Sequence, residues 1–295
     1  MILERQKKML SFLISCGGSM KNTDFMKLLF LYKKENQADN FYDFLPYKFG
    51  PCSFTAYEDR NTLIEKGFLL NGNDWTITQL GRKAASTVDL FMKNFYEKFK
   101  TLRGDELIKY VYKNFPEFAI NSTIIDRISF GDEKLKNSII EAKNKNRAKN
   151  PLSTIGYEGH TIESYFNKLI DSGVTALCDV RKNPISRKKG FSKSSLQKYC
   201  DSLGIKYFHI PELGIESSKR TSLKTQADYD ALFLEYEKDI LPYKGIFLNW
   251  LRDLILKSNE VIALTCFERL PSQCHRHCIS DILCKKINIE RALHL

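Results

Sequence analysis

The chain has 295 residues, of which 43% are hydrophobic and 12% aromatic, and this composition excludes a largely disordered protein. The length is sufficient for two domains. Its formal net charge of +11 favours a polyanionic partner, and we expect nucleic acid, with DNA first and a nucleotide-like small molecule second. Residues 131–200 hold fourteen Lys or Arg against seven Asp or Glu, so much of the positive excess is concentrated there.

No apolar stretch reaches the length of about 18 residues that a membrane-spanning helix requires, and the N-terminus lacks the pattern of a signal peptide. We therefore expect a cytoplasmic protein with no membrane partner. Eight cysteines are few for this length, and in a reducing compartment they are expected to be thiols. Cys178 and Cys200 are interpreted as core residues.

The N-terminal part shows the order helix, helix, hairpin. Apolar residues at positions i, i+3, i+4 and i+7 predict a first helix, capped by Asn22 or Thr23, and these are Phe25, Leu28, Leu29 and Tyr32. A second helix is predicted from Ser53 to Gly67. The apolar segments 68–70 and 75–78 flank Asn71-Gly72-Asn73-Asp74, which predicts a hairpin. This order is typical of a winged helix.

Residues 47–53 read Tyr-Lys-Phe-Gly-Pro-Cys-Ser, and they are followed by Leu63, Gly67 and the segment Thr-Ile-Thr-Gln-Leu-Gly at 76–81. With these motifs, residues 5–85 resemble the antitoxin-like winged-helix domains called Panacea. The resemblance implies contact with DNA or with a partner protein. Such domains also serve as assembly modules, so a homodimer through this domain is the alternative.

Three parts of the chain are predicted. Residues 1–130 form a helical winged-helix-like domain with a helical extension, and residues 151–295 form an α/β domain. Residues 131–150 form a basic linker, in which the cations Lys143, Lys145, Arg147 and Lys149 precede Pro151.

Strands and helices alternate in the C-terminal part. Strands are predicted at 152–157, 174–180 and 205–210 and at Val261, and helices at 162–170, 194–203, 229–238, 246–256 and 273–286. The predicted fold class is therefore α/β, with a mostly parallel layered sheet, preceded by the mainly helical winged-helix domain.

Ionisable groups follow each predicted strand of this domain. Glu158 and His160 follow the first strand, Asp179 and Arg181 the second, His209 and Glu212 the third, and Cys266 and Glu268 the fourth. Because parallel strands end at one edge of a sheet, we expect these side chains to form a cleft for catalysis or anion binding.

Five segments between residues 152 and 284 resemble the domain of unknown function family 488. They are Thr154-Ile155-Gly156-Tyr157, Asp179-Val180-Arg181 with Pro184 and Ser186-Arg187, Pro211-Glu212-Leu213-Gly214, Cys266-Phe267-Glu268, and Cys274-His275-Arg276. The resemblance implies an α/β domain with an active site and no settled reaction. His277 and Cys278 lie outside the family pattern.

The segment 181–195 contains six cations and no acid, which favours phosphate binding over the alternative of a solvated loop. Tyr157 and Phe191 are candidates for stacking on a base, with core packing as the alternative. The predicted substrate- or phosphate-binding residues are Gly156, Tyr157, Arg181, Arg187, Lys188, Glu212 and Arg276.

Asp179 and Glu268 are predicted to act as acid/base or electrostatic groups, with a structural ion pair of Glu268 to Arg276 or Arg181 as the alternative. Cys266, Cys274 and His275 complete the predicted catalytic set, with a thiolate role in view. The cofactor is left unknown and no metal residue is assigned. Zinc is not favoured, because the adjacent Cys274 and His275 would point to different faces of a helix.

The sequence thus predicts an enzyme that acts on nucleic acid or a nucleotide by hydrolytic or glycosidic chemistry. A sulfurtransferase using Cys266 or Cys274 is one alternative, because Asp179-Val180-Arg181 after a buried strand also resembles rhodanese-type domains, although no loop of backbone amides is evident after Cys266. The other alternative is a non-catalytic ligand-sensing regulator or bacterial defence protein.

Overall fold

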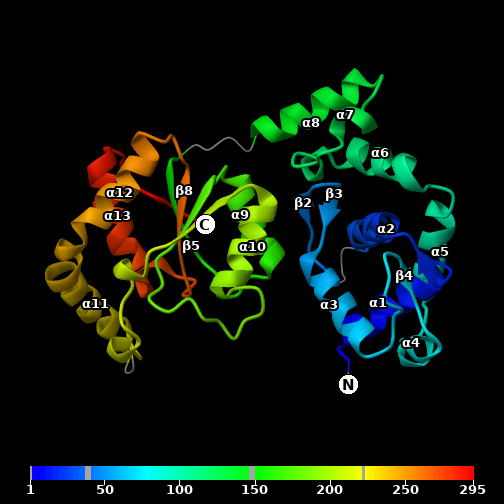
Figure 1. Cartoon of the computed structure of the whole chain (residues 1–295), viewed down its shortest axis with the longest axis horizontal. Coiled ribbons are helices and arrows are strands. Elements are labelled where there is room, and N and C mark those ends of the chain that lie inside the picture. Colours follow the sequence, from blue (N-terminus) through cyan, green and yellow to red (C-terminus); the bar gives the residue numbers. More distant parts are fainter. Residues whose placement is uncertain (1, 37–40, 146–149, 221–222) are drawn as a thin grey trace. The chain divides into compact units, whose positions relative to one another are not determined.

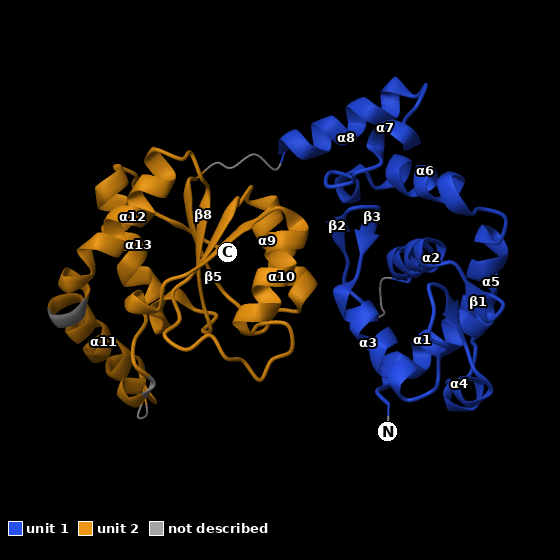
Figure 2. Cartoon of the chain, in the orientation of Figure 1, with its two compact units in different colours: residues 1–145 blue, residues 146–295 orange. Residues whose placement is uncertain are grey.

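The computed structural model describes residues 2–36, 41–145, 150–220 and 223–295. The chain divides into two compact units, residues 1–145 and 146–295 (Figure 2). Each unit buries its own set of apolar side chains. Arg147 and Lys149 of the predicted basic linker lie outside the described residues.

Unit 1, residues 1–145, is mainly helical. Its helices are α1 (Glu4–Ser15), α2 (Asn22–Glu35), α3 (Phe54–Glu65), α4 (Gln79–Ala84), α5 (Leu90–Phe99), α6 (Gly104–Asn114), α7 (Ile125–Ile128) and α8 (Glu133–Lys145). Its short strands are β1 (Ser19–Met20), β2 (Leu45–Tyr47), β3 (Gly50–Cys52) and β4 (Trp75–Thr76). The apolar residues of α2 and the ring of Trp75 are buried in the core of this unit.

The predicted helices of unit 1 are present with shifted ends. Lys21 occupies the N-cap position of α2, where the prediction gave Asn22 or Thr23, and it makes no side-chain cap. Ser53 does cap α3, because its hydroxyl accepts a hydrogen bond from the Ala56 amide at 3.2 Å. The predicted hairpin is reduced to a bridge between Leu69 and Ile77, and β4 pairs instead with β1.

The C-terminal end of unit 1 differs from the predicted linker. Helix α8 covers Glu133–Lys145, and its Leu135 and Ile139 are buried in the core of unit 1. The Lys-rich composition concealed this helix, because only two apolar residues, four positions apart, form its buried face.

Unit 2, residues 146–295, is a layered α/β structure. Its strands are β5 (Leu152–Gly156), β6 (Ala176–Asp179), β7 (Lys206–His209), β8 (Ile262–Cys266) and β9 (Leu293–His294). Its helices are α9 (Ile162–Asp171), α10 (Lys193–Leu203), α11 (Gln226–Glu235), α12 (Gly245–Leu256) and α13 (Arg276–Ile287). Figure 1 shows α9 and α10 on one face of the sheet, and α12 and α13 on the other.

The five strands are parallel and lie in the order β7-β6-β8-β5-β9, which confirms the predicted α/β fold class. The short strand β9 at the edge was not predicted. Strand β8, buried along its whole length, lies between β5 and β6, so its carboxyl end emerges between theirs.

Among the described residues, no helix combines the length and the apolar character needed to cross a membrane.

Candidate functional site

The register of the sheet brings three strand ends together. Gly156 at the end of β5 pairs with Cys266 at the end of β8, and Asp179 at the end of β6 pairs with Thr265. Asp179, Arg181, Cys266 and Glu268, four of the residues expected at this edge, lie at or just after these strand ends. They form two clusters with different chemistry.

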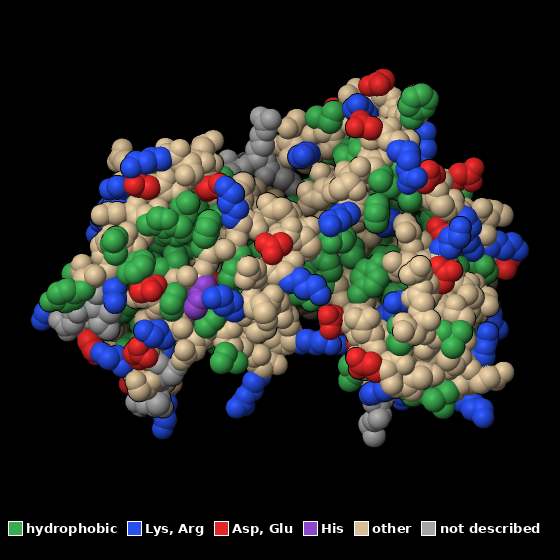
Figure 3. Space-filling view, viewed as in Figure 1, with side chains coloured by type: hydrophobic (Ala, Val, Ile, Leu, Met, Phe, Trp, Pro, Cys, Tyr) green, Lys and Arg blue, Asp and Glu red, His purple; other side chains and the backbone are tan. Residues whose placement is uncertain are grey.

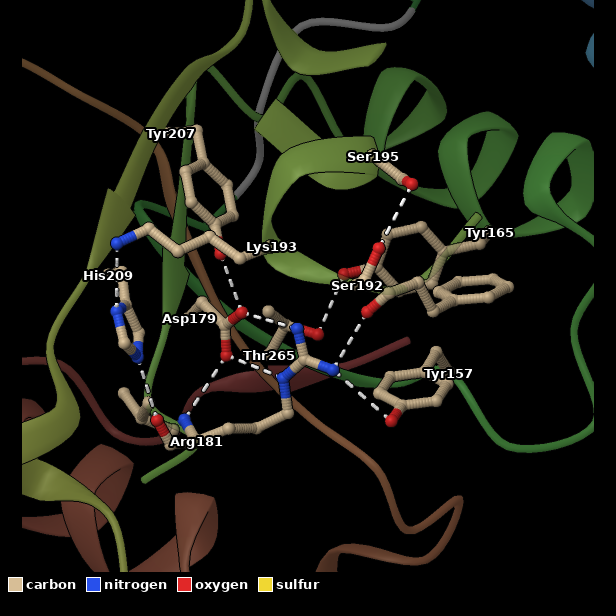
Figure 4. Close-up of polar contacts among 12 residues, drawn as sticks. Tyr157, Tyr165, Asp179, Arg181, Ser192, Lys193, Ser195, Tyr207, His209 and Thr265 are labelled. Carbon is tan, nitrogen blue, oxygen red and sulfur yellow. Dashed lines mark hydrogen bonds and ion pairs between the residues drawn. The ribbon is translucent and has the colours of Figure 1, made fainter. Parts of the chain in front are cut away.

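The first cluster is centred on Asp179, which is fully buried (Figure 4). Arg181 donates to its carboxylate from Nε at 2.8 Å and from Nη2 at 2.5 Å. The hydroxyl of Tyr207 donates to the same carboxylate at 2.7 Å. Both oxygens are engaged and no surface is exposed, an arrangement that favours a structural role for Asp179 over the predicted acid/base role.

The guanidinium of Arg181 is also occupied by hydrogen bonds, at all three of its nitrogen atoms. Its Nη1 donates to the Tyr157 hydroxyl at 3.2 Å and to the Phe191 carbonyl at 2.9 Å, and its side chain is 5% exposed. The rings of Tyr157 and Phe191 stack on each other at 4.7 Å, and both are buried. Arg181 therefore holds the loop that follows β6 in place. This arrangement does not favour Arg181 as a phosphate ligand. It does not favour the two buried rings as surfaces for base stacking either.

Arg276 also has a buried structural position. It donates from Nη1 to the Glu268 carbonyl at 2.5 Å and from Nη2 to the Arg269 carbonyl at 2.9 Å. These bonds fix the backbone after β8. This arrangement does not favour the predicted phosphate-binding role of Arg276, and the ion-pair partner of Glu268 is Arg220 in place of the expected Arg276 or Arg181.

Gly156 lies against the same backbone. A Cβ atom at this position would be 1.8 Å from the Glu268 carbonyl oxygen, so only glycine allows the approach. Gly156 was predicted to contact substrate, but its observed contact is with the turn that carries Glu268.

The second cluster, which we call the thiol–imidazole cluster, consists of Cys266, Glu268, Cys274, His275 and Arg220. Cys274 has an extended backbone, with φ −141° and ψ 130°, and α13 begins only at Arg276. The expectation that Cys274 and His275 point to different helix faces is therefore wrong, because both residues precede the regular helix. Their side chains converge on Cys266 at the end of β8.

Hydrogen bonds define the state of the imidazole. His275 Nε2 is 3.0 Å from the Val180 carbonyl oxygen, which can only accept, so Nε2 carries the proton. Nδ1 therefore presents its lone pair to the cluster. It lies 3.9 Å from Sγ of both Cys266 and Cys274, and Nη2 of Arg220 donates to it at 3.1 Å.

Glu268 lies beside the thiols and remains 13% exposed. Cys266 Sγ donates to its Oε2 at 3.4 Å, and Arg220 Nη1 donates to its Oε1 at 2.8 Å. Burial alone would raise the pKa of Glu268, but the Arg220 charge and the hydrogen bonds outweigh it, so the pKa is lowered. Burial raises the pKa of the Cys274 thiol well above its usual value.

The basic loop, residues 181–195, alternates between exposed and half-buried residues over most of its length. Arg187 and Lys189 are exposed, whereas Lys182 pairs with Glu216 at 2.8 Å. Lys188 donates to the Tyr157 carbonyl at 3.2 Å, and burial lowers its pKa. Figure 3 shows Lys and Arg side chains scattered over the visible face of each unit.

Glu212 is the remaining predicted residue. It is half-buried in a single 3₁₀ turn, Pro211–Leu213, after β7, and it is not one of the groups that make up either cluster.

Two members of these clusters were not predicted. Arg220 comes from a short 3₁₀ turn outside the family motifs, and Tyr207 lies within β7. No spacing rule marks either residue. The sequence shows which residues are charged, but which of them pair with one another depends on how the loops fold.

A further group of donors lies nearby, on residues outside the family pattern. Glu237, His277 and Cys278 have donor atoms within 4.8 Å of one another. His277 Nδ1 donates to the Cys274 carbonyl at 2.7 Å, and Nε2 is 3.5 Å from Cys278 Sγ. Glu237 is exposed, in contrast to the buried donors of the thiol–imidazole cluster.

Comparison with known proteins identifies one relationship. No curated protein and no solved structure gives a significant match to the chain. Residues 161–283 match the family model described as Domain of unknown function DUF488, and this segment contains both clusters except Tyr157. The predicted resemblance of the C-terminal half to this family is thereby confirmed.

Proposed function

We propose that unit 2 is a hydrolase that acts on nucleic acid or a nucleotide, with Glu268 as its proton-transferring carboxylate. One observation carries this proposal. Of the two carboxylates predicted for catalysis, Asp179 is fully buried and bound to Arg181, whereas Glu268 remains 13% exposed beside two thiols and an imidazole. Ligands of open parallel sheets bind at this edge.

The exposed cations support a phosphate-containing substrate. The basic loop is linked to Glu268 through Tyr157, because Lys188 binds the Tyr157 carbonyl and the Tyr157 ring contacts Phe267 at 5.3 Å. Phe267 precedes Glu268 and is 43% exposed. An exposed ring on one side of Tyr157 and the cations of the loop on the other could take a base and its phosphate, which is the pattern of single-strand recognition.

Hydrolysis adds the hydroxyl of water to one side of the broken bond and a proton to the other. Glu268 accepts the proton of the attacking water and returns it to the leaving group. Arg187 and Lys189 bind phosphate by charge alone, in keeping with their exposed positions. The bond that is broken, glycosidic or phosphoester, is the variable that the experiment determines.

Unit 1 is proposed as the docking module, with the winged-helix resemblance as the basis. Helix α3 carries Glu58 and Glu65 but only Arg60 as a cation, and its Asp59 is buried and paired with Arg5. The helix therefore offers no excess of positive charge to DNA phosphates, so we favour a partner protein or a second copy of the chain over DNA for this helix.

The test uses the full chain with duplex DNA, single-stranded DNA, RNA and free nucleotides. Strand cleavage and released bases are measured by gel electrophoresis and mass spectrometry. Glu268→Gln is expected to lose more than 100-fold in rate, as loss of a general base does. Glu290→Gln, an exposed carboxylate outside the site, serves as the matched control.

Full activity in Glu268→Gln would refute the role of this carboxylate. Binding without any product would favour the ligand-sensing regulator instead.

Sulfur transfer ranks second, on the observation that Cys266 and Cys274 meet at the end of β8. The raised pKa of Cys274 weighs against it, because the thiolate is the nucleophile in such reactions. Cyanide-dependent turnover of thiosulfate that disappears in Cys266→Ser would reverse this ranking.

A further inference from the structure

Three donor atoms of the thiol–imidazole cluster converge with the spacing of metal ligands. Sγ of Cys266, Sγ of Cys274 and Nδ1 of His275 lie within 4.8 Å of one another, and both S-to-N distances are 3.9 Å. Zinc bonds of about 2.3 Å to sulfur and about 2.0 Å to nitrogen place these atoms roughly 3.6 Å apart in a tetrahedron. The two sulfur-to-nitrogen distances need to shorten by only a few tenths of an ångström, and the two sulfur atoms already lie within 4.8 Å of each other.

The imidazole is held in the tautomer that a metal requires. The Val180 carbonyl accepts the proton of His275 Nε2, so Nδ1, which lies 3.9 Å from each sulfur atom, keeps its lone pair, and Arg220 now occupies it. Metal-bound histidines almost always donate their other ring N–H to such an acceptor. The three ligands are almost completely buried, as expected for a site that fixes its ion.

A cation already occupies this environment. Arg220 donates to His275 Nδ1 and to Glu268, and its charge also interacts with Cys266 and Cys274. Its buried Nε has no hydrogen-bond partner among the described residues, so the guanidinium is incompletely satisfied there. The cluster thus already binds one positive charge, that of Arg220, although the hydrogen bonds of this guanidinium are incomplete.

We propose that Cys266, Cys274 and His275 bind a zinc ion whose fourth coordination position faces Glu268. Two thiolates balance the charge of Zn²⁺, which removes the cost of burying the ion. Binding releases the two thiol protons to solvent, and Arg220 withdraws from Nδ1. Three protein ligands with one open position form the arrangement of catalytic zinc.

The binding of zinc rests on these donors alone. Its use in catalysis, as the ion that activates the water deprotonated by Glu268, rests on the function proposed above. Glu237, His277 and Cys278 form the competing site, but their exposed carboxylate and single sulfur make them the weaker ligand set for zinc.

The first experiment measures zinc in the purified full chain by mass spectrometry and its ligands by X-ray absorption. We expect one zinc per chain with two sulfur ligands at about 2.3 Å. One sulfur ligand would assign the ion to the competing site and overturn the proposal. So would the absence of zinc from the purified chain together with no binding of added Zn²⁺ in competition with a chromophoric chelator.

Variants then locate the ion. Cys266→Ser and His275→Asn are expected to lose zinc, whereas Cys284→Ser, a buried cysteine of α13 outside both groups, retains it. Loss of zinc in Cys278→Ser with retention in Cys266→Ser would contradict the assignment.

Arg220→Gln supplies a test that does not depend on a damaged ligand. Removal of the competing cation is expected to raise zinc affinity about tenfold, equivalent to about 1.4 kcal/mol. A fall in affinity would contradict the position assigned to the ion. Zinc without hydrolysis would refute the proposed function alone, and hydrolysis without zinc would refute this inference alone.

Discussion

Two clusters lie at the same edge of one sheet, and they differ in how their charged groups are satisfied. Asp179 and Arg181 form a buried pair whose hydrogen bonds are completed by Tyr207, Tyr157 and the Phe191 carbonyl. In the thiol–imidazole cluster, three atoms able to bind a metal lie within 4.8 Å of one another, and Arg220 satisfies only part of the group. Complete pairing marks a structural role, and converging acceptors mark a place for a ligand.

The largest expected effect comes from breaking the structural pair. Asp179→Ala leaves the buried Arg181 without its counter-ion and should lower the free energy of unfolding by about 3–5 kcal/mol. Urea unfolding measures this loss. Asp201→Ala, an exposed aspartate of α10, is the matched control.

Glu268→Gln keeps the shape of its side chain and should cost about 1 kcal/mol or less. Equal losses in Asp179→Ala and Glu268→Gln would remove the distinction between the two clusters.

A second prediction concerns the contact that joins the strand ends. Gly156→Ala places a methyl group against the Glu268 carbonyl and should destabilise unit 2 by about 1–3 kcal/mol. Gly245→Ala, where an added Cβ meets no atom within 4 Å, should have little effect. Because the strain falls on the Glu268 turn, zinc affinity should fall as well. Unchanged stability would show that this backbone relaxes freely.

The third prediction uses pH. Burial and the charge of Asp179 raise the pKa of Tyr207 far above its usual value. The unfolded chain therefore loses this proton near pH 10 while the folded chain keeps it, so stability falls by about 1.4 kcal/mol per pH unit above pH 10. Tyr207→Phe should remove this part of the slope in urea unfolding between pH 9 and 11.5.

Tyr243→Phe, at an exposed position, is the control for that measurement. Identical slopes in Tyr207→Phe and the parent chain would contradict the buried hydrogen bond to Asp179.

The smallest expected effect concerns the basic loop, which borders both clusters. Arg187→Gln should reduce the slope of log K against log salt for nucleic acid by about 0.9 if Arg187 contacts one phosphate. Filter binding over a salt series measures it. Lys257→Gln, a cation at the end of α12 paired with Asp253, is the control. No change in Arg187→Gln would exclude the loop from binding.

Much of unit 2 could be predicted from the sequence. Its strands are short apolar runs separated by amphipathic segments, and this alternation identifies a parallel sheet without knowledge of any contact. The gathering of polar residues at one edge follows from the same rule. Strand β9 could not be predicted, because two residues carry no periodicity.

The partners within the site could not be predicted in the same way. Arg181, Arg187 and Arg276 were all predicted to bind phosphate. Arg181 and Arg276 are buried and donate to carbonyl or carboxylate oxygens, whereas Arg187 is exposed. Loop conformation decides this difference. The thiol–imidazole cluster was underrated because the start of α13 was placed three residues too early, which assigned helical geometry to Cys274.

The strand order of unit 2 has a consequence for synthesis on the ribosome. Strands β5 and β6 do not pair with each other, and both pair with β8, whose Ile262 lies 109 residues after Ser153. At about 5–20 residues per second, β5 waits roughly 5–20 s for its partner after it leaves the exit tunnel. We therefore expect fragments that stop before β8 to aggregate, because β5 and β6 then lack the strand that joins them.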